Sequence, residues 1–262
     1  MRFRSVYVSV LMLAAALAVM SQLAWASQIV YEGFNLTFPA YNSGAGFSGA
    51  WATGGFNAFA SGYTANGKSL SYSGEQGNSA ALQTSGGSVS GEAFSAINGA
   101  VRHLAQSLGV NNTTVYVSFL IRPNGTLNDG VFNGFFGLTL NGSLGNDLFI
   151  GKPGGGAEEQ YVLETRGGFG QVPSGTPTVV GQTTFLVLKA QFLAGNDVFT
   201  LYTNPAPGAP EPTSGVLKTD LDLGVVSTVG IYSTGAFTID EIRIGTTYAE
   251  VAPATSTNSQ QN

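Results

Sequence analysis

The chain has no cysteine, one histidine and few charged residues, which make up 10% of its 262 positions. Without cysteine it has no disulfide, no thiol nucleophile, no thiolate metal site and no N-terminal cysteine for lipid attachment. A serine triad would need the one histidine, His103, and no serine of the chain stands in a G-x-S-x-G context, so a triad is not indicated. A lone histidine is more often a surface or packing residue than a catalytic one.

The charge balance is acidic. Ten Lys and Arg stand against fifteen Asp and Glu, a formal charge of −5. If a leader containing Arg2 and Arg4 is removed, eight basic residues remain against fifteen acidic ones, which gives −7. An acidic, charge-poor surface does not attract nucleic acid or an anionic membrane. The sequence therefore predicts neither as a partner.

The first 26 residues have the features of a secretory signal peptide. Arg2 and Arg4 precede an apolar run over residues 6–19, and residues 24–26 (AWA) form a small-x-small cleavage site. The run is shorter than the ~20 residues of a transmembrane helix. We predict a signal peptide over residues 1–26, no membrane span in the mature chain, and a secreted or periplasmic location.

Residues 27–250 have the pattern of one antiparallel β domain. Short apolar segments alternate with Gly, Asn and Ser turns about every 8–12 residues, which is typical of a sandwich or jelly roll. Residues 183–204 predict a long hairpin that turns at GND, and the four prolines of residues 205–212 exclude a central strand there. Residues 251–262 are predicted to form a flexible polar tail.

One segment, residues 95–108, has helical spacing instead. Ile97, Val101, Leu104 and Leu108 recur at intervals of four, three and four, and Gly109 stands where a helix would end. We predict a short helix or an irregular turn here, with a strand followed by a loop as the alternative.

Seven segments, taken in order, resemble the concanavalin A-like (laminin-G-like) jelly-roll domains of secreted bacterial proteins. They are VYEGFN, VYVSFLIRP, FFGLTL, LFIGKPGG, YVLETRGG, FLVLKAQFLAGNDVFTLYTNP and IDEIRIGTTYAEVAP. The resemblance implies an all-β fold, a two-sheet antiparallel β-sandwich with one concave sheet. Many such proteins are uncharacterised surface or exported proteins, and the resemblance supplies no catalytic residues. The internal Pro210-Glu211-Pro212 is not followed by an apolar span and is not taken as a sorting motif.

Tyrosine and arginine residues in the strand segments are candidates for a ligand site. On a concave sheet, tyrosine rings would stack on sugar rings and arginine would hydrogen-bond to hydroxyl groups. Tyrosine is also favoured on strands for packing alone, so both interpretations stay open. The candidates are Tyr116, Arg122, Tyr161, Arg166 and Tyr202.

Glu32 and Asp240 are candidates for a structural Ca²⁺ site. On a regular strand Asp240 shares the inward face with the isoleucines that follow it, while Glu241 and Arg243 form a solvent-side pair. Pairing of the first and last strands would bring Glu32 close to Asp240, and two carboxylates with backbone carbonyls bind Ca²⁺. The alternative is a hydrogen-bonded aspartate at the sheet rim without a metal. No other cofactor is indicated.

Two functions are consistent with these features. One is an exported non-enzymatic module that binds a polysaccharide or surface glycan, or that serves in the cell surface or matrix. The other is a polysaccharide-degrading enzyme, a glycoside hydrolase or a lyase. Retaining hydrolysis needs two carboxylates ~5–5.5 Å apart. The nearest cluster is Glu158, Glu159 and Glu164, and its first two members point to opposite faces of a strand. We predict the non-enzymatic module and keep the enzyme as the alternative.

Overall fold

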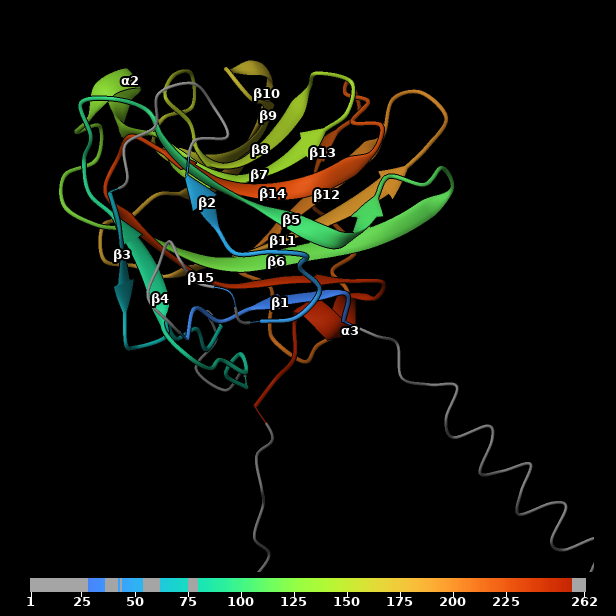
Figure 1. Ribbon diagram of the computed structural model, residues 1–262, viewed down its shortest axis with the longest axis horizontal. Coiled ribbons are helices and arrows are strands. Elements are labelled where there is room, and N and C mark those ends of the chain that lie inside the picture. The colour runs from blue at the N-terminus through green and yellow to red at the C-terminus, as the bar shows by residue number, and fades with distance from the viewer. Residues whose placement is uncertain (1–27, 36–41, 43, 54–61, 75–79, 256–262) are drawn as a thin grey trace, which may run out of the picture.

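The computed structural model describes residues 28–35, 42, 44–53, 62–74 and 80–255. Within them the chain forms two antiparallel β-sheets packed face to face, which are the two layers of Figure 1. The predicted fold class, an all-β two-sheet antiparallel sandwich, is confirmed. The predicted signal peptide, residues 1–26, lies outside the described residues.

The first sheet has eight strands in the order β13-β12-β11-β6-β15-β4-β3, with β1 also paired to β15. The long β15 uses one edge for two neighbours, because its first half pairs with β4 and its second half with β1. The predicted hairpin is β11–β12. The strands are β1 (Val30–Glu32), β3 (Tyr63–Asn66), β4 (Ser88–Gly91), β6 (Thr113–Pro123), β11 (Thr184–Phe192), β12 (Val198–Thr203), β13 (Val216–Lys218) and β15 (Phe237–Gly245).

The second sheet has seven strands in the order β10-β9-β8-β7-β14-β5-β2. Its strands are β2 (Ala52–Thr53), β5 (Asn98–Leu108), β7 (Phe136–Gly142), β8 (Asp147–Lys152), β9 (Gln160–Thr165), β10 (Phe169–Pro177) and β14 (Val226–Ser233). Two one-turn helical elements, α2 (Val131–Gly134) and α3 (Tyr248–Val251), complete the described structure. Neither is long or apolar enough to cross a bilayer, and the described ranges hold no other helix that is.

Strand alternation forms the core between the sheets. In β6, Val117, Phe119 and Ile121 face the second sheet and have no exposed surface. The intervening residues face outward, yet Leu120 is also fully buried. A second apolar cluster covers this outer face, and it combines Leu70, Tyr72 and Leu82 with residues of β6, β11, β12 and α3. The eight-stranded sheet is therefore covered on both sides over much of its area.

Within the segment at residues 95–108, Asn98–Leu108 form the strand β5, and a loop follows at residues 109–112. The predicted helix or irregular turn is therefore wrong, and the alternative, a strand followed by a loop, is present. Ala100, Arg102 and Leu104 alternate on the inner face of β5, and Arg102 is only 2% exposed. Because a charged residue occupies an inner position, the two-residue period of this strand is hidden in the sequence. The apolar residues that remain happen to recur at helical spacing.

The sandwich extends beyond residue 250, which shortens the predicted tail of residues 251–262. Val251 and Ala252 are fully buried, and Ala254 forms a β-bridge with Leu82. The backbone N–H of Thr255 donates to the carbonyl of Ala81 at 2.8 Å. Residues 251–255 thus belong to the fold, and residues 256–262 lie outside the described part of the chain.

Candidate functional site

A cleft of about 630 Å³ lies on the outer face of the seven-stranded sheet. Its volume falls within the ~300–1,000 Å³ typical of small-molecule sites. Phe149 of β8, Glu164 of β9 and Tyr232 of β14 line it. These side chains point outward because their strand neighbours face the core. The core-facing neighbours are Ile150, Leu163 and Ile231.

Aromatic rings form a connected surface in this cleft. Phe135 lies against Tyr232, with ring centroids 4.7 Å apart, and edge-on to Phe149 at 6.2 Å. The residues paired with Tyr232 on the adjacent strands are Gly99 and Gly137. Because neither has a side chain, the ring has no side chain directly opposite it on either side.

Two glycine-rich turns border the cleft. Residues 154–156 follow β8, and residues 167–168 connect β9 to β10. Gly167 and Gly168 have φ values of 103° and 92°, which favour glycine. Beyond this turn Phe169 is 72% exposed. The borders therefore offer backbone groups and an exposed aromatic ring, with little side-chain bulk at the turns themselves.

Arg166 brings a positive charge to the cleft. Its Nε donates to Asp147 Oδ2 at 2.8 Å, and its guanidinium lies 5.4 Å from the centre of the Tyr232 ring. Asp147 also accepts a hydrogen bond from the backbone N–H of Gly142 at 3.1 Å. The ion pair fixes the guanidinium beside the aromatic surface.

Glu164 and Gln171 bring hydrogen-bonding groups. Gln171 Nε2 donates to Glu164 Oε2 at 2.8 Å and to the carbonyl of Gly155 at 3.0 Å. Gln171 Oε1 accepts from the backbone N–H of Ala157 at 2.7 Å. Burial raises the pKa of Glu164, which is 6% exposed. The amide thus ties the glycine-rich border to a buried carboxyl group in the cleft.

A left-handed turn presents another aromatic ring at the rim. Phe132 and Asn133 both have φ of 52°, and the Phe132 side chain is 63% exposed. The buried Lys152 holds the turn, since its Nζ donates to the carbonyls of Asn133 at 2.7 Å and Pro153 at 3.2 Å. Burial lowers the pKa of Lys152 to about 8. Strained backbone of this kind is concentrated at functional sites.

The structure does not gather the five predicted ligand residues on one surface. Arg166 lies in the cleft, whereas Tyr161 is fully buried in the core between the sheets. Arg122 lies on β6 opposite Thr238, in the other sheet. Tyr116 and Tyr202 do lie together, in the apolar cluster on the outer face of the eight-stranded sheet. A shared platform fails because these strands belong to different sheets and present different faces.

Tyr116 and Tyr202 are packed under the strap formed by residues 205–212. Both phenol groups donate to the Glu211 carboxylate at 2.7 Å, and Lys189 Nζ donates to it at 2.9 Å. Tyr248 of α3 lies edge-on to both rings. With 7% and 6% of their surface exposed, the two tyrosines fasten the strap and α3 to the sheet.

Sequence reasoning missed most of the cleft. Glu164 was considered only within a carboxylate cluster, and Phe132, Phe149, Gln171 and Tyr232 were not singled out. One signal was available, because β8 (DLFIGK) and β9 (QYVLET) alternate core residues with aromatic, acidic and glycine residues. Which alternate face is open depends on the packing of the two sheets.

Glu32 and Asp240 do not share an ion, because they lie on opposite faces of the eight-stranded sheet. The predicted pairing of β1 with β15 is present, with Glu32 opposite Ile242. Glu32 points into the sandwich, where it forms an ion pair with Arg102 of the other sheet and accepts a hydrogen bond from Trp51 Nε1 at 2.9 Å. The predicted two-carboxylate Ca²⁺ site is therefore not formed by these residues.

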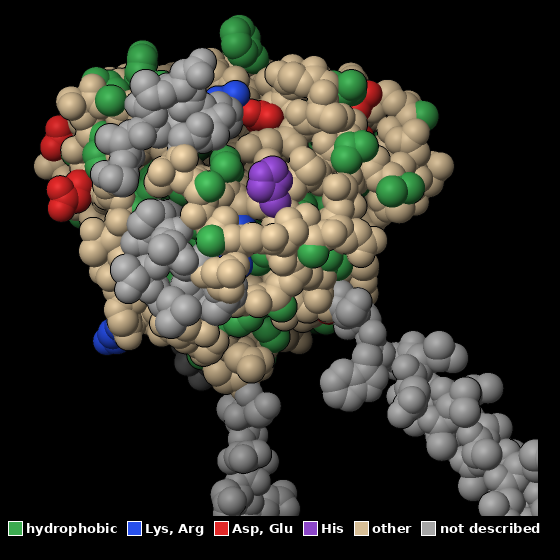
Figure 2. Space-filling view, in the orientation of Figure 1, with side chains coloured by type: hydrophobic (Ala, Val, Ile, Leu, Met, Phe, Trp, Pro, Cys, Tyr) green, Lys and Arg blue, Asp and Glu red, His purple; other side chains and the backbone are tan. Residues whose placement is uncertain are grey.

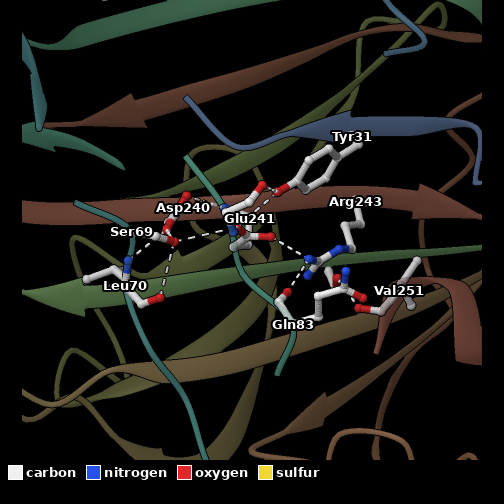
Figure 3. A network of polar contacts seen from close by, with 10 residues as sticks. Tyr31, Ser69, Leu70, Gln83, Asp240, Glu241, Arg243 and Val251 are labelled. Atoms are coloured by element: carbon white, nitrogen blue, oxygen red, sulfur yellow. Dashed lines mark hydrogen bonds and ion pairs between the residues drawn. The ribbon is translucent and has the colours of Figure 1, made fainter. Parts of the chain in front are cut away.

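A β-bulge places Asp240 on the outer face instead. The register of β15 against β6 slips between Asp240 and Arg243, and Glu241 has a φ of 56°. Asp240 accepts hydrogen bonds from Ser69 Oγ at 2.5 Å and the Leu70 backbone N–H at 2.8 Å (Figure 3). The extra residue brings two successive carboxylates to the same side of the strand.

The predicted solvent-side pair of Glu241 and Arg243 is buried. Glu241 has no exposed surface and Arg243 has 3%. Glu241 forms an ion pair with Arg243 and accepts hydrogen bonds from the backbone N–H of Ser85 at 2.6 Å and from Tyr31 Oη at 3.1 Å (Figure 3). Within the described ranges no three His, Asp or Glu side chains gather as metal ligands. This network joins β15 to Ser69, Leu70, Gln83 and Ser85.

We expect Asp240 to make stability fall as pH rises from about 5 to 8. Burial, together with the negative charge of Glu241, raises the pKa of Asp240 from 3.8 to about 8. The folded state thus holds a proton that the unfolded state releases, so this contribution is complete below the unfolded pKa and is lost through the folded one. Burial also raises the pKa of Glu241, so Glu241 changes stability with pH in the same sense as Asp240.

Urea denaturation of wild type and Asp240→Asn between pH 5 and 8 measures this contribution. The variant should lose part of the decline in the free energy of unfolding. Glu211→Gln is the matched control. Burial opposes ionisation of Glu211, but the hydrogen bonds from Tyr202, Lys189 and Tyr116 outweigh it and lower its pKa. Because its pKa is at or below 4.5 in both the folded and the unfolded state, its removal should leave the slope between pH 5 and 8 as in wild type. An unchanged slope in Asp240→Asn would contradict the assignment.

Comparisons with known proteins give structural likeness only. No family model matches the chain, and no curated protein matches its sequence. The globular domain of T. cruzi calreticulin is 11% identical, with a TM-score of 0.48 over 86% of this chain and 90% of that one. An endo-1,3-beta-glucanase from Streptomyces sioyaensis is 7% identical, with a TM-score of 0.49 over 83% and 95%. The lectin UEA-II, complexed with galactose, is 9% identical, with a TM-score of 0.39 over 70% and 97%. These values are too low to transfer a ligand, a reaction or a site residue.

Proposed function

We propose that this protein is an exported, non-enzymatic β-sandwich module that binds a glycan in the cleft over β8, β9 and β14. The observation that carries the proposal is the cleft itself, in which connected aromatic rings lie beside a guanidinium, a carboxyl group and an amide. The signal-peptide features support a secreted or periplasmic location. The ordered segments support placement among the laminin-G-like proteins of bacteria.

Sugars suit this combination of groups. A pyranose ring has an apolar face of C–H groups, which packs on aromatic rings, and an edge of hydroxyl groups, which need donors and acceptors. Tyr232 and the exposed Phe132 supply the aromatic surface, while Phe135 and Phe149, only 8% and 1% exposed, pack as its support. Gln171 and Glu164 supply hydrogen-bonding groups in the same cleft.

The enzymatic alternative lacks a second catalytic group in the described lining of the cleft. Glu164 is the one carboxylate there, and two-carboxylate hydrolysis needs a partner. Asp147, on the adjacent strand, is held by Arg166 and by the backbone of Gly142. The histidine of the chain, His103, lies on β5 and is absent from the described lining. These positions favour binding without turnover.

A glycan array followed by isothermal titration with the best oligosaccharide tests the proposal. The mature protein should bind saturably and leave the oligosaccharide intact. Tyr202→Phe, on the other sheet, should bind like wild type. Binding to no glycan would reject the function. Release of reducing ends or unsaturated products from a polysaccharide would support the enzyme instead.

Phe132→Ala should weaken glycan binding about two- to tenfold in Kd, as expected for the loss of one aromatic contact. The side chain is 63% exposed at the cleft rim, so its removal should leave folding intact. Leu144→Ala is the matched control, since Leu144 is 58% exposed and lies outside the cleft lining. Isothermal titration of both variants with the oligosaccharide measures the effect. If Phe132→Ala and Leu144→Ala bind it with equal affinity, Phe132 is not part of the site.

A further inference from the structure

Arg166, the positively charged residue in the described lining of the cleft, already forms an ion pair with Asp147 of the protein itself. Arg166 is in contact with Asp147 at 2.8 Å, in a pair whose side chains are 27% and 10% exposed. A carboxylate or sulfate on a ligand would have to compete with Asp147 for the same guanidinium.

The two lysines near the cleft are equally unavailable to an anion. Lys152 has no exposed surface, and its ammonium donates to the carbonyls of Asn133 and Pro153. Lys218 is 1% exposed, donates to the carbonyl of Gly170 and forms an ion pair with Asp220 at 2.8 Å. Reaching either one would require the wall of the cleft to open.

The remaining charges around the cleft are negative. Glu164 lines it, and Glu158 accepts a hydrogen bond from Asn133 Nδ2 at 3.1 Å at the rim. Figure 2 shows few Lys, Arg, Asp or Glu side chains on the face that it presents, in keeping with the 10% of charged residues in the chain. The local field therefore does not favour an anionic ligand.

We infer that the cleft selects uncharged glycans and discriminates against chains that carry uronate or sulfate groups. This rests on the proposed glycan-binding function and adds the ligand class. The aromatic surface supplies stacking that is independent of charge. Asp147 acts as the selective element, because it occupies the guanidinium that an acidic sugar would need.

Titration calorimetry with uncharged and acidic oligosaccharides of equal length tests the inference. The uncharged ligands, built from glucose, xylose or mannose, should bind about tenfold or more tightly than uronate or sulfated ones, as expected when a ligand charge meets no free partner. Their affinity should not depend on salt between ~50 and ~500 mM, because no ligand charge is screened.

Asp147→Asn provides the sharper measurement, because it keeps the shape of the side chain and releases Arg166. The ratio of acidic to uncharged affinity should shift toward the acidic ligand by about tenfold at low salt. Glu211→Gln is the matched control, since Glu211 pairs with Lys189 on the other sheet at 2.9 Å. Its ratio should equal that of wild type.

The outcomes separate the inference from the function. Wild type that prefers the acidic ligand, with affinity that falls with salt and is lost in Tyr232→Ala, overturns the inference and leaves the glycan site standing. An unchanged ratio in Asp147→Asn overturns the role of Asp147. Binding of neither class by wild type rejects the proposed function, and the inference with it.

Discussion

Arg102→Met should lower the free energy of unfolding by ~3–5 kcal/mol, because it leaves a buried carboxylate without its counter-charge. Arg102 on β5 and Glu32 on β1 join the two sheets, with 2% and 0% of their side chains exposed. Arg102 Nε also donates to the carbonyl of Gly49 at 2.7 Å, and the guanidinium lies 4.0 Å from the centre of the Phe47 ring. Methionine replaces part of the apolar contact and none of the charge.

Urea denaturation at pH 7 measures this loss. Arg166→Met is the matched control, because its ion pair with Asp147 is partly exposed and should contribute at most ~1 kcal/mol. The double variant Arg102→Met with Glu32→Gln removes the stranded charge and should recover part of the stability. A loss below ~1 kcal/mol in the single variant would mean that the pair does not hold the sheets together.

Tyr232→Ala should weaken glycan binding by ~2 kcal/mol, about 30-fold in Kd, the cost expected for a central aromatic anchor. The ring lines the cleft, and its centre lies 4.7 Å from that of Phe135 and 5.4 Å from the Arg166 guanidinium. Its removal takes away the stacking surface and a support of the arginine. Tyr232→Phe keeps the ring and should stay within a few-fold of wild type.

The melting temperature of Tyr232→Ala must be measured beside its affinity, since the ring packs against Phe135. Tyr116→Phe is the matched control on the other sheet, where the phenol contacts Glu211. A folded Tyr232→Ala protein that binds with wild-type affinity would place the glycan site elsewhere. A folded variant that has lost binding would support the cleft.

The candidate site was the least predictable part of the molecule. Of the predicted ligand residues, Arg166 lies in the cleft. The three predicted tyrosines are packed elsewhere in the molecule. The sequence marks Tyr116, Tyr161 and Tyr202 as strand residues, and strand tyrosines pack as readily as they bind. Tyr232 has the same local signature, and the open cleft above it distinguishes it from the others.

The all-β character, the hairpin β11–β12 and the inner face of β6 were determined by the sequence itself, because alternation and turn residues are local properties. Tertiary structure decided which sheet face stays open. Residues 69–74 and 80–85 cover one sheet through contacts between residues as far apart as Ser69 and Asp240, while the other sheet keeps a cleft. Tertiary structure also decided which face of the sheet Asp240 lies on, because one bulged residue in β15 moves it to the outer face. It decided the burial of Arg102 as well, whose partner Glu32 lies 70 residues away in the sequence. Such contacts depend on how distant segments pack, which no local pattern records.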